Sequence, residues 1–216
     1  MTLLAKKEEK VYKLVDEGLY VAKCVSVIYL GTQPTEFEGK KSLKPQVMLQ
    51  FEIPEIVIEF KKDDKLESFN KILSKTYTVS LGDLATLRKD LTRWRNRAFT
   101  QEELDGFNLS NVLGKDCQIQ IIHEKKNDKT FQKIEILPVG KGHKSIKVEN
   151  ELLLFDLEEN GIEGMLKLPE WMQEKIKKST TYEELRCQSV KSKYDESEVS
   201  DEDFHDDLIG EEEIPF

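Results

Sequence analysis

The most distinctive chemistry in this sequence lies in residues 195–216. This segment holds eleven Asp or Glu residues and no Lys or Arg. Like charges at this density repel one another, so we expect a disordered interaction tail that adds nothing to a core. The tip, Ile214-Pro215-Phe216, is apolar instead, and we expect it to carry the terminal carboxylate. A ring and a carboxylate together suit a small pocket with an arginine, and the acidic run would steer the tip toward basic surfaces.

The tail changes what the overall charge implies. The chain has 33 Lys and Arg against 42 Asp and Glu, a formal net charge of -9, which by itself argues against nucleic acid. Eleven of these acids lie in the tail, so residues 1–194 hold 31 acids and 33 bases, a net of +2. A basic body with an acidic tail indicates nucleic-acid binding with a mobile acidic segment. The alternative is a solubilising tail on a neutral domain.

Three basic clusters in the body could hold a phosphate backbone. Cations follow phosphates without reading the base sequence, and each base stacked on an exposed ring contributes about 1–3 kcal/mol. The candidate DNA-binding residues are Phe37, Lys40, Lys41 and Lys44 in a first segment, Lys125, Lys126, Lys129, Phe131 and Lys133 in a second, and Arg88 and Arg93 on a predicted helix. The alternative is that the two segments are solvated turns and the arginines form a solvated helix face.

The sequence gives no sign of catalysis or of a cofactor. Three cysteines and three histidines are scattered without the spacing of metal ligands, so we expect no metal and no cofactor. No nuclease motif and no nucleotide-binding phosphate loop is present, so we expect a protein that is not an enzyme. The scattered cysteines indicate a reducing cytosol, and with no apolar segment that could serve as a signal peptide or membrane span we expect a cytoplasmic protein.

The hydrophobic pattern predicts a strand-rich scaffold for these residues. Strands are predicted over residues 19–30, 47–53, 76–81, 117–123 and 131–139, with an edge strand after Pro54 and a long loop over residues 31–45. Phe51 and Tyr77 alternate in phase with aliphatic residues, so we expect them in the core. Phe131 lies on the opposite side of its strand from Ile134 and Ile136, so we expect it to face outward.

One amphipathic helix interrupts the strands. Its apolar stripe recurs every three or four residues and predicts a helix over residues 83–96, with Asp83 or Ser80 as its cap. The stripe consists of Leu84, Leu87, Leu91 and Trp94, and we expect Trp94 to pack inward with its indole N–H hydrogen-bonded. Thr100 and Glu103 have the spacing of a capping box for a further short helix.

This order of elements predicts the fold class. Three strands, a helix and two more strands form the order of an OB-fold, a small barrel used widely for single-stranded nucleic acid. We therefore expect a mainly β, five-stranded OB-fold barrel over residues 1–140, with the two lysine segments as the loops that border its binding face. An SH3-like barrel or a mixed α+β sandwich gives a similar order.

Beyond residue 140 the sequence predicts a helical extension over residues 141–194, followed by the acidic tail over residues 195–216. Short helices are predicted over residues 169–178 and 180–190, and Trp171, Met172 and Ile176 could form an apolar patch. We expect the extension to pack on the barrel or on a second subunit, so a homo-oligomer is possible.

Two parts of the chain resemble known proteins. The end, GEEEIPF, is similar to the C-terminus of bacterial single-stranded DNA-binding proteins. The body, including LGTQPTEFEGKK, SLGDLATLRKDLTRWRNRAFTQEELDGF and LPEWMQEKI, looks like a family of phage and prophage early proteins. The resemblance implies a phage-encoded protein that coats single-stranded DNA during replication or recombination in a bacterial cytoplasm. The body does not resemble the bacterial protein, so that protein's tetramer is not implied here.

The resemblance also assigns the tail a partner. In single-strand binders with such a tail, the tip recruits replication, repair and recombination enzymes. The residues implied are Asp206, Asp207, Glu211, Glu212, Glu213, Ile214, Pro215 and Phe216. The alternative function is a decoy, which would mimic the host protein's tip and occupy its partners without binding DNA itself.

Overall fold

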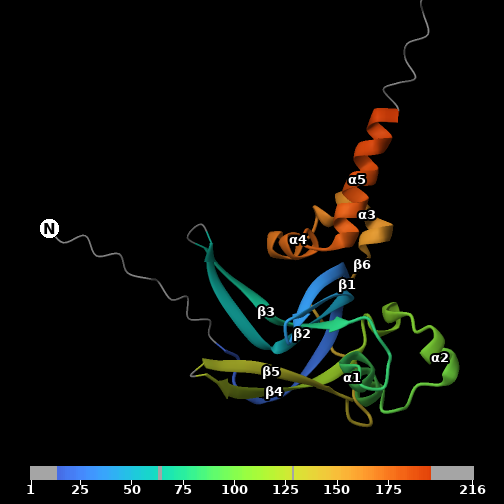
Figure 1. Cartoon of the computed structure of the whole chain (residues 1–216). Helices are drawn as coiled ribbons and strands as arrows, with labels where there is room; N and C mark the ends of the chain where they lie inside the picture. The colour runs from blue at the N-terminus through green and yellow to red at the C-terminus, as the bar shows by residue number, and fades with distance from the viewer. Residues whose placement is uncertain (1–13, 63–64, 128, 196–216) are drawn as a thin grey trace, which may run out of the picture.

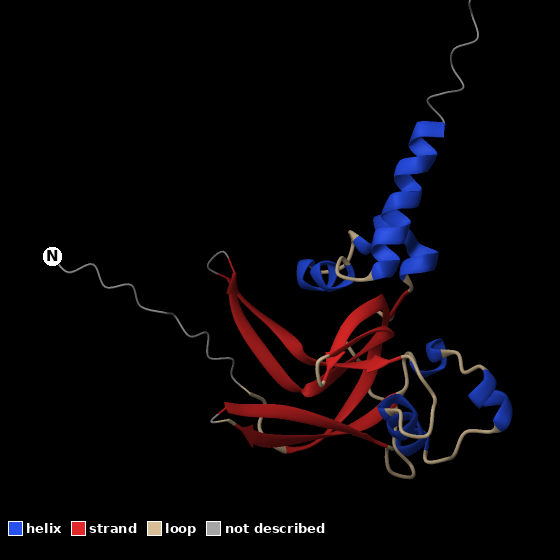
Figure 2. Ribbon diagram, viewed as in Figure 1, coloured by secondary structure: helices blue, strands red, loops and turns tan. Residues whose placement is uncertain are grey.

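The computed structural model describes residues 14–62, 65–127 and 129–195, and a single curled sheet dominates it (Figure 1). Figure 2 shows the strands together, with helices at two separate places beside them. The five main strands are hydrogen-bonded in the order β3-β2-β1-β4-β5, all antiparallel, and a sixth pairs with β1 outside this path. The strands are β1 (Gly18–Phe37), β2 (Lys40–Lys62), β3 (Lys65–Thr78), β4 (Asp116–Lys126), β5 (Lys129–Leu137) and β6 (Leu153–Phe155). The prediction of a mainly β protein is confirmed, and the five strands form a half-barrel.

Strand β1 curls the sheet because it changes partners along its length. Its first part, Gly18–Lys23, pairs with β4, whereas Lys23–Phe37 pairs with β2. Two register shifts, between Cys24 and Ser26 and between Tyr29 and Thr32, interrupt the β1–β2 ladder. Such irregularities bend a strand and increase its twist. The same strand therefore joins the β2–β3 side of the half-barrel to the β4–β5 side.

Residues 31–45 form most of a β-hairpin, so the prediction of a long loop is wrong. β1 continues to Phe37 and β2 starts at Lys40, which leaves Glu38 and Gly39 as the turn. Both have positive φ angles, 49° and 75°, as a two-residue type I′ turn requires. The hydrophobic pattern did not predict this hairpin, because its strands are exposed and therefore need no alternation of apolar and polar residues. Its turn also lacks the Asn-Gly or Asp-Gly pair that usually marks type I′.

Strands β2 and β3 also differ from the prediction. β2 continues through Pro54, because a register shift between Ile53 and Val57 accommodates the proline. β3 ends at Thr78, so the predicted strand over residues 76–81 covers only its last residues. The earlier, polar part of β3 pairs with the end of β2 and shows no apolar alternation in the sequence.

The inner side of the sheet holds the larger hydrophobic core. Helix α1 (Thr86–Arg95) and the 3-10 turn η1 (Leu109–Val112) pack on it. Helix α2 (Gln101–Asp105) lies between them in the chain and has no buried residue. The predicted inward positions are confirmed as buried, including Phe51, Tyr77, Leu87, Leu91, Trp94, Ile134 and Ile136. The indole N–H of Trp94 donates to the carbonyl oxygen of Asp116 at 2.8 Å.

The start of α1 differs from the prediction in two details, whereas the predicted start of α2 is confirmed. The helix begins at Thr86 after Ala85, so neither Asp83 nor Ser80 caps it. Leu84 therefore lies before the helix and is 86% exposed rather than part of the stripe. The capping box of Thr100 and Glu103 is present at the start of α2.

The outer side of the sheet is covered by residues 153–195, here called the C-terminal unit. This unit consists of β6, which pairs in parallel with β1, and of α3 (Leu157–Met165), α4 (Glu170–Ile176) and α5 (Thr180–Asp195). Figure 1 shows its helices on one side of the sheet, away from α1 and α2. A second core joins it to the sheet and includes Ile28, Leu30, Met48, Phe155, Leu157, Met165, Met172 and Ile176. Among the described residues, no helix is long and apolar enough to cross a membrane.

Candidate nucleic-acid interface

The β4–β5 hairpin presents most of the second lysine segment on one face. Residues directly opposite in the ladder share a face, and their neighbours along each strand lie on the other. Because Ile134 and Ile136 face the core, the intervening side chains face outward. That outward face carries Lys126, Lys129, Phe131 and Lys133, whereas Lys125 lies on the opposite face. Phe131 is 51% exposed, so its ring is accessible to a base, and its predicted outward orientation is confirmed.

The β1–β2 hairpin separates the first lysine segment in the same way. Lys44 lies opposite Gln33, and Lys40 shares its face four pairs further along, at the turn. Lys41 lies opposite Glu36 on the other face. All three lysines are exposed. Phe37 pairs with Lys40 through its backbone, but its side chain lies outside the part of the structure that is described.

The two hairpins lie at opposite ends of β1. The β1–β2 turn follows the C-terminal end of β1, at Glu38 and Gly39. Gly18, at the other end, pairs with Ile121, so the tip of the β4–β5 hairpin extends beyond the start of β1. The structure therefore does not bring the two lysine segments together. A single nucleic-acid strand that contacts both segments must cross the half-barrel.

The hairpin lysines differ from the other candidate cations in their partners. Among the described residues, no ion pair involves Lys40, Lys41, Lys44, Lys125, Lys126 or Lys129. Arg88 Nη1 instead lies 2.5 Å from Asp83 Oδ1, and Arg93 Nη1 lies 3.4 Å from a Glu135 oxygen. A phosphate can approach an unpaired ammonium without displacing a carboxylate, so the six lysines are the better phosphate contacts.

Lys133 belongs with the paired cations despite its exposed position. Its Nζ lies 3.0 Å from Glu124 Oε1 and 3.7 Å from Glu135 Oε1. The hydrogen bond and charge of Glu124, with Glu135 beside it, raise the pKa of the Lys133 ammonium. The remaining arginines of this region are also paired, since Arg95 and Arg97 both bind Glu103.

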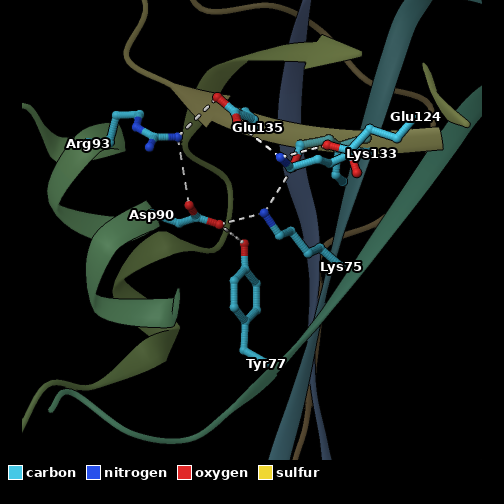
Figure 3. A network of polar contacts seen from close by, with 8 residues as sticks. Lys75, Tyr77, Asp90, Arg93, Glu124, Lys133 and Glu135 are labelled. Carbon is cyan, nitrogen blue, oxygen red and sulfur yellow. Dashed lines mark hydrogen bonds and ion pairs between the residues drawn. The ribbon is translucent and has the colours of Figure 1, made fainter. Parts of the chain in front are cut away.

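A polar network joins β3 to β5, the two strands at the ends of the sheet order (Figure 3). Lys75 Nζ on β3 donates to Asp90 Oδ2 on α1 at 2.7 Å and to the Ile134 carbonyl oxygen on β5 at 2.9 Å. Tyr77 Oη donates to the same Asp90 oxygen at 2.8 Å. Burial, with the Asp90 charge beside it, raises the pKa of the Tyr77 hydroxyl, which stays protonated as a donor. We call this group, with Arg93, Glu124, Lys133 and Glu135, the seam network.

A buried carboxylate on β2 holds the segment that precedes the C-terminal unit. Glu52 is fully buried, and its oxygens accept hydrogen bonds from Asn70 Nδ2 at 2.8 Å and from the Glu149 N–H at 2.7 Å. They also accept from the Asn150 N–H at 3.0 Å and from Asn150 Nδ2 at 2.6 Å. Burial alone would raise the pKa of Glu52, but these donors lower it overall. The segment leading to β6 is therefore fixed on the outer face of the sheet.

A second carboxylate holds the start of the same segment. Asp116 lies 3.3 Å from Lys23 Nζ, and it accepts hydrogen bonds from the Ile146 N–H at 3.2 Å and from His143 Nε2 at 3.1 Å. Burial opposes the effect, but hydrogen bonds from Ser145, His143 and Lys23 lower the pKa of Asp116. Residues 143–150 are thus tied to the sheet at two places.

The predicted partner-binding residues, at positions 206, 207 and 211–216, lie outside the described residues. In the part of the chain that is described, no group of three or more His, Cys, Asp or Glu side chains is placed to hold a metal ion. Cys24 and Cys117 are buried as expected, and burial raises the pKa of the Cys24 thiol to about 12.

The class defined by these features is a mainly β half-barrel with unpaired lysines on two hairpins and a helical unit fixed on its outer side. No protein-family model matches the chain. A comparison with curated proteins gives no match either.

Proposed function

We propose that the half-barrel is of the OB type and that the chain binds single-stranded DNA without sequence preference. The sheet order and the position of α1 between β3 and β4 in the chain support this type of barrel. The contact of Asp90 on α1 with Lys75 on β3 agrees with a helix that packs where the two sides of the barrel meet. In such barrels the bound single-stranded nucleic acid lies near the β1–β2 and β4–β5 connections.

The observation that carries the proposal is the pairing of the cations. The six hairpin lysines are exposed and meet no carboxylate among the described residues, while the neighbouring arginines are neutralised. Unpaired cations bind a phosphate backbone by releasing its counterions, which gives affinity that depends on salt and not on sequence. Phe131, on the same face as Lys126 and Lys129, supplies an exposed ring on which any base can stack.

The acidic tail has two roles in this proposal, both inferred from its sequence. As a polyanion it competes with DNA for the hairpin lysines, so bound DNA displaces it. The displaced tip, Ile214-Pro215-Phe216, then recruits replication, recombination or repair enzymes. We place this activity in phage replication or recombination because of the resemblance of the body to phage and prophage early proteins.

A titration of fluorescently labelled oligo-dT with the full chain tests DNA binding. We expect an increase in anisotropy at sub-micromolar protein and weaker binding as salt rises. A variant that ends at Tyr194 should bind more tightly at low salt, where competition by the tail is least screened. Equal affinity of the two proteins at low salt would overturn the competition. No binding by either protein would favour the decoy function.

Deletion of Phe216 tests recruitment separately. The variant keeps the acidic run, so we expect the same affinity for oligo-dT but no capture of the host enzymes that bind single-strand-binding tips. The full chain is the matched control in the same pull-down. Capture that survives the deletion would contradict the role of the tip.

A further inference from the structure

On the outer side of the sheet, the side chains of β3 form an exposed strip beside the part of β2 that is covered. Gln50 and Met48 on β2, which lie opposite Ser74 and Thr76, are buried beneath the C-terminal unit and the segment before it. Their partners on β3 remain exposed, as does Thr78 two residues further along. The C-terminal unit therefore covers the β2 side of this face and leaves a strip that carries Ser74, Thr76 and Thr78.

Helix α4 borders this strip with an exposed tryptophan. Its neighbours Met172 and Ile176 are buried, whereas Trp171 is 52% exposed. Trp171 lines a pocket of about 320 Å³ together with Ile72, the β3 residue that precedes the hydroxyl row on the same face, and with Gln50. An exposed indole beside an apolar floor is a platform on which a base can stack.

Two lysines border the same strip further along. Lys175 lies one helical turn after Trp171, and its Nζ donates to Thr76 Oγ1 at 3.3 Å. In the described part of the chain it meets no carboxylate. Lys44 lines a second pocket, of about 660 Å³, together with Thr76 and Thr78. Cations, hydroxyls and a ring thus lie along about 20 Å of one strand, at the ordinary rise of about 3.3 Å per residue.

We propose that this strip is a DNA-binding subsite, in which a base stacks on Trp171 and the phosphates contact Lys175 and Lys44. The inference rests on the proposed function and extends its contact surface from the hairpin residue Lys44 to Trp171 and Lys175, which the hairpins do not include. The polarity of the strip follows from its charges. Glu151 lines the Trp171 pocket, so that end takes the uncharged base. The Lys44 pocket also contains a carboxylate, Asp83, but Arg88 pairs with it, so the phosphates lie toward the lysines.

The two tryptophans make the subsite directly measurable. Trp94 is 7% exposed, and its indole N–H is already hydrogen-bonded, so Trp171 is the one of the pair that can meet a base. We expect oligo-dT to quench the intrinsic fluorescence of the full chain. In Trp171→Phe the quenching should disappear, while the anisotropy of labelled oligo-dT still reports binding, because phenylalanine can also stack.

Removal of the ring tests its contribution to affinity. Trp171→Ala should weaken oligo-dT binding about fivefold or more, the loss typical of one stacked base. The matched control is Leu166→Ala, which removes another exposed apolar side chain of the C-terminal unit and should leave affinity unchanged. Lys175→Gln should lower the salt dependence of binding by about one phosphate contact.

The outcomes separate this inference from the proposed function. If labelled oligo-dT binds but the fluorescence of Trp171 does not change and Trp171→Ala binds normally, the subsite is wrong and the hairpins remain the DNA contacts. If oligo-dT does not bind at all, both proposals fail. Quenching in the full chain that is absent in Trp171→Phe, together with weaker binding by Trp171→Ala, supports the subsite.

Discussion

The seam network and the two hairpins contain similar cations in opposite situations. In the seam network, Lys75 and Arg93 meet Asp90, and Lys133 meets Glu124 (Figure 3). The six other hairpin lysines form no ion pair within the described residues: Lys40, Lys41, Lys44, Lys125, Lys126 and Lys129. The difference shows that the number of cations in a segment does not measure the charge available to a ligand. The available charge depends on which cations the fold places beside carboxylates.

The two regions should therefore respond differently to mutation. A paired, partly buried cation links structural elements, so loss of its partner should lower stability. An exposed, unpaired cation adds little to stability, and its loss should appear in the salt dependence of DNA binding.

Asp90→Ala should give the largest effect on stability. Asp90 is buried, and its removal leaves the Lys75 ammonium and the Tyr77 hydroxyl without their shared acceptor. Breaking a buried pair in this way costs about 3 kcal/mol in the free energy of unfolding. Urea denaturation measures the loss, with Lys89→Ala, an exposed neighbour on α1, as the control. An unchanged denaturation midpoint would show that the seam network does not hold β3 to β5.

Glu52→Gln should give a smaller effect that depends on pH. The pKa of folded Glu52 is lowered by its four donors, so its contribution to stability is complete above the unfolded pKa of about 4.3 and is lost as pH falls through the folded pKa. At neutral pH the substitution should lower the free energy of unfolding by about 1–2 kcal/mol. The reason is that the amide NH₂ of the glutamine is a donor and would face the N–H groups that donate to Glu52. Unfolding measured between pH 7 and pH 3 should show the two proteins converging at acid pH. Parallel curves would contradict this account.

The parts of the fold that could be predicted from the sequence are those in which buried apolar residues recur at helical or strand spacing. Leu87 and Leu91 at helical spacing located α1, and Ile134 and Ile136 at alternate positions located β5. The β1–β2 hairpin and the first half of β3 were missed because both are exposed. Without a buried face, a strand has no alternation that distinguishes it from a loop.

The candidate site was predictable only in its exposed lysines. The pairing of Arg93 with Glu135 could not be seen, because Glu135 lies on a distant strand. Asp83, the partner of Arg88, is only five residues away in the sequence. Asp90 lies between Leu87 and Leu91 near the apolar stripe, and this position was the sign of its burial in the sequence. Its partner Lys75 is on a different element, and pairing across elements depends on the tertiary fold.

Loss of the β4–β5 lysines should change DNA binding and leave stability unaltered. Lys125→Gln, Lys126→Gln and Lys129→Gln combined should lower the slope of log affinity against log salt by about 2, if each lysine contacts a phosphate. The matched control replaces the exposed connector lysines Lys141, Lys144 and Lys147 by Gln, with the same change in net charge. Equal slopes for the two triple variants would mean that only net charge matters and would remove the hairpin from the interface.

Glu124→Gln should give the smallest effect and in the opposite direction. It removes the carboxylate that holds Lys133 on the outward face of the β4–β5 hairpin, beside Phe131. Lys133 then keeps only its longer ion pair with Glu135, at 3.7 Å, and is more available to a phosphate. We therefore expect slightly tighter binding of oligo-dT at low salt and a slope that is steeper by up to about 0.7. Glu59→Gln, at an exposed position on β2, is the control for the loss of one negative charge. If both variants shift affinity equally, general charge explains the gain. A steeper slope in Glu124→Gln alone would show that pairing, and not position, keeps Lys133 from DNA.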